Sequence, residues 1–428
     1  IFLTPAEMSK SMGSPLLIAA VWLVMGAFSI LGALCYGELA ARFPEAGGGY
    51  VYLREAYGPR VAFMYGWKCF LVMDPGLTAA LATGVASYAA YIANLSWAAS
   101  KGIAIACILI MAAVNIAGVG SGAFLARWLT ALKLGLLLFI ICWAIGFGLG
   151  DWSHFTPLVA RRAGSAPIGV ALAGGFVSAF FSLAGWWDVN RLAGEVHEPQ
   201  KTLPRALFWG ITIVTVVYLA TSAVFLYLVP IERVTSGETF AAQAGEALFG
   251  KTGGVVFSAV VIVSVVGSLA AFIIAAPRLY YAMARDRLFP KTAARIHPKF
   301  GTPVRAIAIQ AVLACVLVLV GNFRSIVAYF IFVTVAFIGL TVAGLFIIRK
   351  REGGVGPYRV PGYPFTPIAF VAVVVILLLV LVAGNPLQAL VGTVVVLLGL
   401  PVFQLVPREH GAGSAAQSID GERGPPGA

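Results

Sequence analysis

Residues 176–206 read FVSAFFSLAGWWDVNRLAGEVHEPQKTLPRA, and this stretch decides both the fold and the site. It begins as an apolar run and ends in a polar loop. Midway, Ser182, Ala184 and Gly185 are small, and a helix that unwinds there exposes backbone groups, which a membrane tolerates only where they line a cavity. Half-helix ends attract the carboxylate and the ammonium of a zwitterion. Small residues equally suit close helix packing, so spacing alone leaves both readings open.

The composition indicates that the whole chain, and not only this stretch, belongs to a membrane protein. Of 428 residues, 60% are hydrophobic and 11% are charged, whereas soluble domains carry about 25% charged residues. Because lipid admits only helices or closed barrels, and the short alternating strands of a barrel are absent, we expect an all-α polytopic membrane protein. Runs of roughly 20 apolar residues predict eleven spans, near 15–40, 60–94, 102–118, 124–149, 168–193, 205–229, 254–284, 304–321, 324–348, 366–384 and 386–405.

The distribution of Lys and Arg predicts the orientation. When the loops are sorted alternately, most basic residues, Arg191 among them, fall on one side; the other side holds only Lys101, Arg161, Arg162, Arg233, Lys251 and Arg324. The positive-inside rule makes the first side cytoplasmic. We therefore expect a multi-pass protein of the cytoplasmic membrane, with a transmembrane domain over 1–406 and a disordered cytoplasmic tail over 407–428. The net charge of +12 reflects this topology rather than nucleic-acid binding.

Two loops predict short helices of their own. Residues 42–58 mix polar and aromatic side chains, which indicates an amphipathic cytoplasmic helix. Residues 237–250 predict an interfacial helix on the outer side that could cover a vestibule.

The sequence lacks the signs of an enzyme. The four histidines fall in loops or tails, no phosphate-binding loop is present, and the five cysteines lie inside apolar runs. We therefore expect no catalytic residues, no metal, no cofactor and no ATP-driven pumping. With no cysteine in an outer loop, we also expect no disulfide-linked accessory subunit.

The stretch around Gly185 resembles the sixth helix of the amino acid–polyamine–organocation (APC) superfamily, specifically of bacterial permeases like the L-type amino acid transporters. The matching residues are Phe181, Gly185, Trp186, Asn190, Glu195, Val196, Pro199, Leu203, Pro204 and Arg205. Further segments resemble other family motifs, namely 1–5, 36–48, 277–290 and 358–364. The resemblance covers nearly the whole chain.

This resemblance implies two inverted five-helix repeats, the leucine-transporter-type fold, plus two extra C-terminal helices. Broken first and sixth helices would meet at the midplane. Ser182, Ala184 and Gly185 would offer backbone groups to the substrate, with Phe181 as an aromatic gate and Asn190 a polar contact lower in the pathway. Ile1 would belong to the same site. Because the family's glycine-rich turn would precede Ile1, we expect the first helix to be incomplete and the chain N-terminally truncated.

Charges inside spans are costly and mark function by default. The resemblance implies that Lys133 replaces a coupling sodium ion and braces the broken first helix; snorkelling is the alternative. Asp74, before Pro75, could relay a proton or hold a cationic substrate, but we favour a carboxylate bound to backbone that the proline frees. We expect Lys68 to snorkel to the inner interface and Glu38 to pair with cytoplasmic arginines.

These observations predict sodium-independent secondary transport of amino acids by alternating access, as an exchanger or a proton-coupled permease. A polyamine or organic-cation transporter is an alternative, which would need carboxylates such as Asp74 or Asp188 in its cavity. A non-transporting amino acid sensor is the second alternative.

Overall fold

The computed structural model describes residues 4–117, 122–233, 240–289, 297–298, 302–321, 323–352 and 356–405. Ile1 and the predicted tail over 407–428 lie outside this part of the chain. Within it, the regular elements are helices, which confirms the all-α class. Their order is α1 (Pro5–Met12), α2 (Pro15–Arg42), α3 (Gly49–Tyr57), α4 (Pro59–Lys68), η1 (Cys69–Met73), α5 (Asp74–Ala93), α6 (Trp97–Ile116), α7 (Gly122–Gly146), η2 (Trp152–Phe155), α8 (Ile168–Leu183), η3 (Trp186–Glu195), α9 (Pro199–Leu228), η4 (Ile231–Arg233), α10 (Phe240–Arg285), α12 (Val304–Val320), α13 (Phe323–Glu352), α14 (Phe365–Gly384), α15 (Pro386–Leu397) and α16 (Gly399–Leu405).

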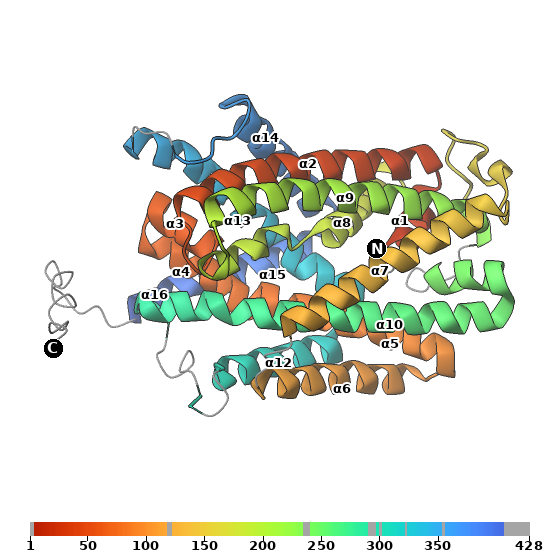
Figure 1. Cartoon of the computed structure of the whole chain (residues 1–428), viewed down its shortest axis with the longest axis horizontal. Helices are drawn as coiled ribbons and strands as arrows, with labels where there is room; N and C mark the ends of the chain where they lie inside the picture. Colours follow the sequence, from red (N-terminus) through yellow and green to blue (C-terminus); the bar gives the residue numbers. More distant parts are fainter. Residues whose placement is uncertain are drawn as a thin grey trace, which may run out of the picture.

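The long helices form a bundle in which α2, α9 and α10 follow the long axis of the molecule (Figure 1). In the described residues, nine helical segments are long and apolar enough to cross a membrane, and Thr130–Gly146 and Val304–Val320 are shorter apolar helices. Each of the eleven predicted spans therefore coincides with a helix or a pair of joined helices. The prediction of a multi-pass membrane protein is confirmed.

Both predicted short helices are present. The segment 42–58 contains α3, which buries Tyr50, Tyr52 and Leu53. The segment 237–250 contains the start of α10, which leaves helical geometry at Phe249 and Gly250, where Gly250 has φ +66°. A kink therefore separates a short helix from the long apolar one that follows it.

The span over Pro59–Ala93 is interrupted by the π-helical turn η1 immediately before Asp74 and Pro75. Proline lacks an N–H, and its ring crowds the carbonyl of the residue four positions earlier. One wider turn relieves this clash, and such π-turns are frequent at functional sites. The turn brings Lys68, Cys69 and Asp74 into the buried interior.

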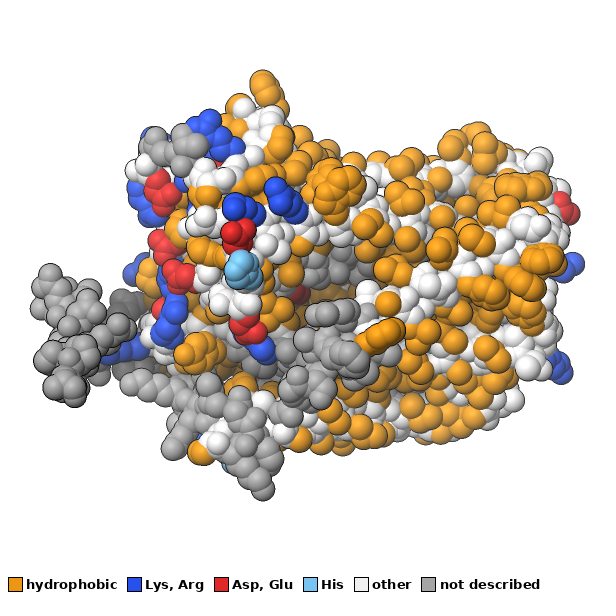
Figure 2. All heavy atoms as spheres, viewed as in Figure 1, with side chains coloured by type: hydrophobic (Ala, Val, Ile, Leu, Met, Phe, Trp, Pro, Cys, Tyr) orange, Lys and Arg blue, Asp and Glu red, His pale blue; other side chains and the backbone are white. Residues whose placement is uncertain are grey.

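Charged side chains gather at one end of the bundle, over α3 and the end of α13 (Figure 2). There Glu38, which is fully buried, forms salt bridges with Arg42 at 2.9 Å and with Arg349. The backbone N–H of Val360 donates a 2.7 Å hydrogen bond to the same carboxylate. The predicted pairing of Glu38 with arginines is confirmed, and it joins α2 to α13 and to the segment before α14.

Candidate functional site

The predicted span over 168–193 is broken where the sequence predicts. Helix α8 ends at Leu183, Ala184 adopts an extended conformation with ψ 160°, and Gly185 has φ +96° before the 3-10 helix η3 begins. Gly185 tolerates this left-handed conformation because it has no Cβ. A Cβ built at Gly185 would meet no atom within 4 Å, so close packing does not explain this glycine.

The break leaves the last carbonyl groups of α8 without helical partners, which gives this end a partial negative charge. The first residues of α1 meet the same end, because the hydroxyls of Thr4 and Ser182 are in hydrogen-bond contact. Thr4 is the N-cap of α1, whose N-terminus carries the opposite partial charge. Two helix ends of opposite sign therefore lie together in the interior, an arrangement that suits the carboxylate and ammonium of a zwitterion.

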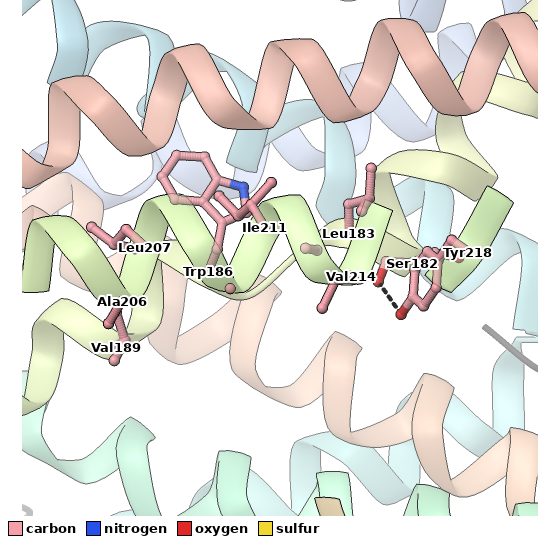
Figure 3. A pocket seen from close by; sticks show the side chains of 11 residues that line it. Ser182, Leu183, Trp186, Val189, Ala206, Leu207, Ile211, Val214 and Tyr218 are labelled. Carbon is pink, nitrogen blue, oxygen red and sulfur yellow. Dashed lines mark hydrogen bonds between the residues drawn. The ribbon is translucent and has the colours of Figure 1, made fainter. Parts of the chain in front are cut away.

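A cavity of about 320 Å³ opens beside the break, within the range of about 300–1,000 Å³ typical of small-molecule sites. It lies between the broken span and α9 and is lined by Ser182, Leu183, Ala184, Trp186, Val189, Ala206, Leu207, Gly210, Ile211, Val214 and Tyr218. Figure 3 shows Ser182 and Tyr218 turned toward each other at one end of this cavity. The hydroxyl of Tyr218 donates a 2.8 Å hydrogen bond to the Ser182 carbonyl oxygen.

Of the residues expected at the site, Ser182 and Ala184 line this cavity, and Gly185 forms the turn beside it. Phe181 is buried next to them, with its ring centroid 6.3 Å from that of Phe330. Asn190 is fully buried away from the lining residues, and its amide donates a 3.5 Å hydrogen bond to the Tyr36 carbonyl. In this structure Asn190 holds η3 against α2.

Lys133 is partly buried in α7, and its ammonium donates a 2.8 Å hydrogen bond to the Ser268 hydroxyl on α10. The resemblance would have it brace the broken first helix, and residues 1–3 of that helix lie outside the described residues. The bracing role therefore stays a prediction. What the structure shows is a lysine that joins α7 to α10.

The preferred interpretation of Asp74 is wrong. Its carboxylate accepts hydrogen bonds from the Tyr280 hydroxyl and, at 3.4–3.5 Å, from the Arg191 guanidinium. Arg191, sorted above with the basic residues of the cytoplasmic side, is fully buried in η3. Lys68 does not snorkel either, because it is 1% exposed and its ammonium lies 4.8 Å from the Tyr65 ring centroid.

Sequence reasoning missed Tyr218 and Arg191. Tyr218 is one of several polar side chains in a long apolar helix, and it stands 36 positions from its partner Ser182. Arg191 is one more arginine near a predicted span end. A pattern search could have found Arg191 only by treating every charge within ten residues of a helix break as interior.

A bundle of apolar helices in which two half-helix ends meet at an interrupted backbone defines a secondary transporter. The chain belongs to the amino acid permease family, whose model matches residues 1–400. It is 32% identical over 409 residues to the serine/threonine exchanger SteT of Bacillus subtilis (strain 168), covering 94% of this chain and 91% of that protein. This family is one of amino acid transporters of the APC superfamily, and the protein is a transporter and not an enzyme.

Two human relatives are also similar to this chain, at lower sequence identity. Asc-type amino acid transporter 1 of Homo sapiens is 28% identical over 422 residues, covering 95% of this chain and 78% of that protein. Large neutral amino acids transporter small subunit 2 of Homo sapiens is 28% identical over 419 residues, covering 95% and 76%.

Proposed function

We propose that this protein transports small neutral amino acids by alternating access, without sodium, and that exchange is its main mode. The observation that carries the proposal is the meeting of the α1 and α8 ends at Thr4 and Ser182. The similarity to a serine/threonine exchanger supports both the substrate class and the mode. Alternating access would use two inverted five-helix repeats that rock around the broken helices.

The cavity lining supports a neutral substrate. Among the described residues that line it, the polar side chains are Ser182, Trp186 and Tyr218, and none is charged. Asp74 and Asp188, the carboxylates that a polyamine would need, are outside the lining and lie against Arg191. This arrangement disfavours an organic-cation substrate, because a bound polyamine would find no counter-charge in the cavity.

Sodium independence rests on Lys133. A fixed ammonium between α7 and α10 can supply the positive charge that a bound sodium ion supplies in other transporters. Since the charge is part of the chain, no ion has to bind before the substrate does. The proposal thus assigns Lys133 a permanent electrostatic role.

The charged end of the bundle supports a cytoplasmic position for α3 and for the end of α13. We propose the same side for the C-terminus from the distribution of Lys and Arg in the sequence. We also propose that the protein works without a disulfide-linked subunit. One human relative is named a small subunit, but the cysteines of this chain lie in apolar runs, and Cys35 and Cys69 are buried. Migration as a single species on non-reducing gels would support this statement, and a dithiol-sensitive complex would contradict it.

The test is counterflow in proteoliposomes preloaded with unlabelled L-serine or L-threonine, with labelled substrate outside and with sodium present or replaced by choline. The expected result is saturable accumulation in both salts, and competition by small neutral amino acids but not by putrescine. A sensor would bind L-serine without counterflow, and accumulation only in sodium would remove the role of Lys133. Empty liposomes and liposomes without preloaded substrate are the controls.

A further inference from the structure

Four charged side chains form one buried cluster beside the broken helix, separate from the residues that line the cavity. They are Lys68, Asp74, Asp188 and Arg191, and each is at most 6% exposed. They come from α4 and α5, which are joined by η1, and from η3, where Arg191 lies 117 positions from Asp74. Charges buried this deeply in a membrane protein are expensive unless they are paired, so the pairing within the cluster is informative.

Asp74 and Arg191 form the hydrogen-bonded half of the cluster. Arg191 directs both terminal nitrogens at the Asp74 carboxylate, and the Tyr280 hydroxyl donates to the same group. Hydrogen bonds from a guanidinium to a carboxylate are stronger than those between neutral groups. This pair provides a fixed charge balance that ties η3 to α5 and α10.

Asp188 is the incompletely paired member. Its Oδ1 lies 2.9 Å from Arg191 Nε, but neither of its carboxylate oxygens receives a hydrogen bond among the described residues. The guanidinium that faces Asp188 is already engaged by Asp74. Asp188 and Asp74 therefore share one guanidinium at a site where both carboxylates are buried.

Lys68 does not supply the missing counter-charge directly. Its ammonium contacts the Met73 sulfur at 3.2 Å and lies over the Tyr65 ring, and the salt bridges found in the described part of the chain do not include it. The cluster therefore holds one hydrogen-bonded pair, Asp74 with Arg191, and one carboxylate, Asp188, that lies against the same guanidinium without a hydrogen bond to it.

The groups that face Asp188 from the neighbouring elements are few. They are Tyr36 on α2, Tyr65 and Lys68 on α4, Cys69 on η1, Asp74 on α5, Tyr280 on α10 and Arg191 on η3 itself. Other charges near these elements have other partners or are exposed. Glu38 on α2 binds Arg42, and Arg278 on α10 binds Glu195. On the neighbouring α3, Arg54 binds Asp286, and Lys201 and Arg205 on α9 are exposed.

Asp188 is also connected to the break. Its backbone N–H donates a 3.0 Å hydrogen bond to the Gly185 carbonyl, so Asp188 forms the first turn after the unwound residues. Addition of a proton to its carboxylate weakens the attraction to Arg191 and loosens η3 from the cluster. Loss of the proton restores that attraction.

We propose that Asp188 is a proton-binding site that couples proton movement to amino acid transport, with Asp74 and Arg191 as its fixed counter-charges. This inference rests on the proposed transport function. A proton from water binds a carboxylate oxygen of Asp188 in one orientation of the protein and returns to water in the other. No other bond forms or breaks.

The test uses the full-length protein in proteoliposomes that contain the pH dye pyranine, with labelled L-serine or L-threonine outside. An inward proton gradient should drive net accumulation and acidify the interior together with the substrate. Asp188→Asn should retain counterflow but lose both the acidification and the dependence of uptake on pH over about pH 5 to 8. Asp151→Asn, the same change at an exposed outer-loop position, should behave as wild type.

The outcomes separate the two proposals. Absence of counterflow in the wild type contradicts the transport function itself. Counterflow without any proton movement overturns the role of Asp188 and leaves the transport function standing, and so does proton movement that survives in Asp188→Asn. If Asp188→Asn does not fold, Asp188→Glu decides: a shifted pH midpoint of uptake supports the proposal, and an unchanged midpoint contradicts it.

Discussion

The Tyr218 hydroxyl on α9 donates a 2.8 Å hydrogen bond to the backbone carbonyl of Ser182, one residue before α8 ends. This carbonyl belongs to the last turn of a half-helix and has no helical N–H to accept from. Tyr218 therefore stabilises the broken state and fixes the direction of the carbonyl beside the cavity. The bond links α9, which forms one wall of the cavity, to the broken end of α8.

Tyr218→Phe removes this donor and leaves the carbonyl in an apolar wall. We expect a loss of stability of about 1–3 kcal/mol, the usual effect of an unsatisfied buried acceptor, together with slower exchange. Thermal unfolding in detergent and initial counterflow rates measure the two effects. Tyr281→Phe, at a half-exposed position of α10, is the matched control and should change neither. Equal effects in both variants would contradict the role of Tyr218.

Gly185→Ala tests whether transport needs the left-handed backbone conformation at the break. A Cβ at this position meets no neighbour within 4 Å, but φ is +96°, so we expect strain of about 1–3 kcal/mol and a marked loss of exchange. Gly174→Ala, inside helical α8 with equally open space, should be neutral or slightly stabilising because alanine favours helix. If the two variants exchanged amino acids equally well, the left-handed turn would not matter for transport.

Lys133→Ala removes the ammonium that contacts Ser268. We expect uptake in sodium-free medium to fall sharply, with partial recovery when sodium is added. Lys251→Ala, at an exposed position of α10, serves as the control. Intact uptake without any gain of ion dependence would show that Lys133 is not a substitute for a coupling ion.

Arg161 caps the far end of α1, donating from Nε to the Met12 carbonyl at 2.9 Å and from Nη2 to the Ser11 carbonyl at 3.1 Å. Because α1 positions Thr4, Arg161→Ala should lower substrate affinity as well as stability, the latter by about 1.5–3 kcal/mol for bonds to a charged donor. Arg161→Lys should recover only part of the loss. The exposed Arg233→Ala should leave thermal unfolding and half-saturation unchanged; a matching loss there would indicate a general loop effect.

The helical class, the eleven spans and the break at Gly185 could be predicted because each depends on local sequence. Bilayer thickness sets span length, and a glycine between small residues marks where a helix can open. The residues around and after the break also carry the motif that resembles the sixth helix of the APC superfamily. These features need no knowledge of which helices are neighbours.

The charged cluster could not be predicted, because its contacts are set by packing. Arg191 and Asp74 are 117 positions apart, and hydropathy sorts an arginine near a span end into a loop. Hydropathy also does not reveal the 3-10 geometry of η3, which changes which side chains face inward. The burial of Lys68 could not be predicted for the same reason, because it depends on the π-helical turn that comes next in the chain.

The most direct measurement of the central claim, that the broken helix binds the substrate, is protection of a single cysteine. Ala184→Cys, in a chain without the five native cysteines, places a thiol at the cavity wall. Saturating L-serine or L-threonine should slow its reaction with a methanethiosulfonate reagent and should not affect Ala99→Cys on the exposed start of α6. Unchanged labelling of Ala184→Cys in a variant that still exchanges these amino acids would show that the substrate binds elsewhere.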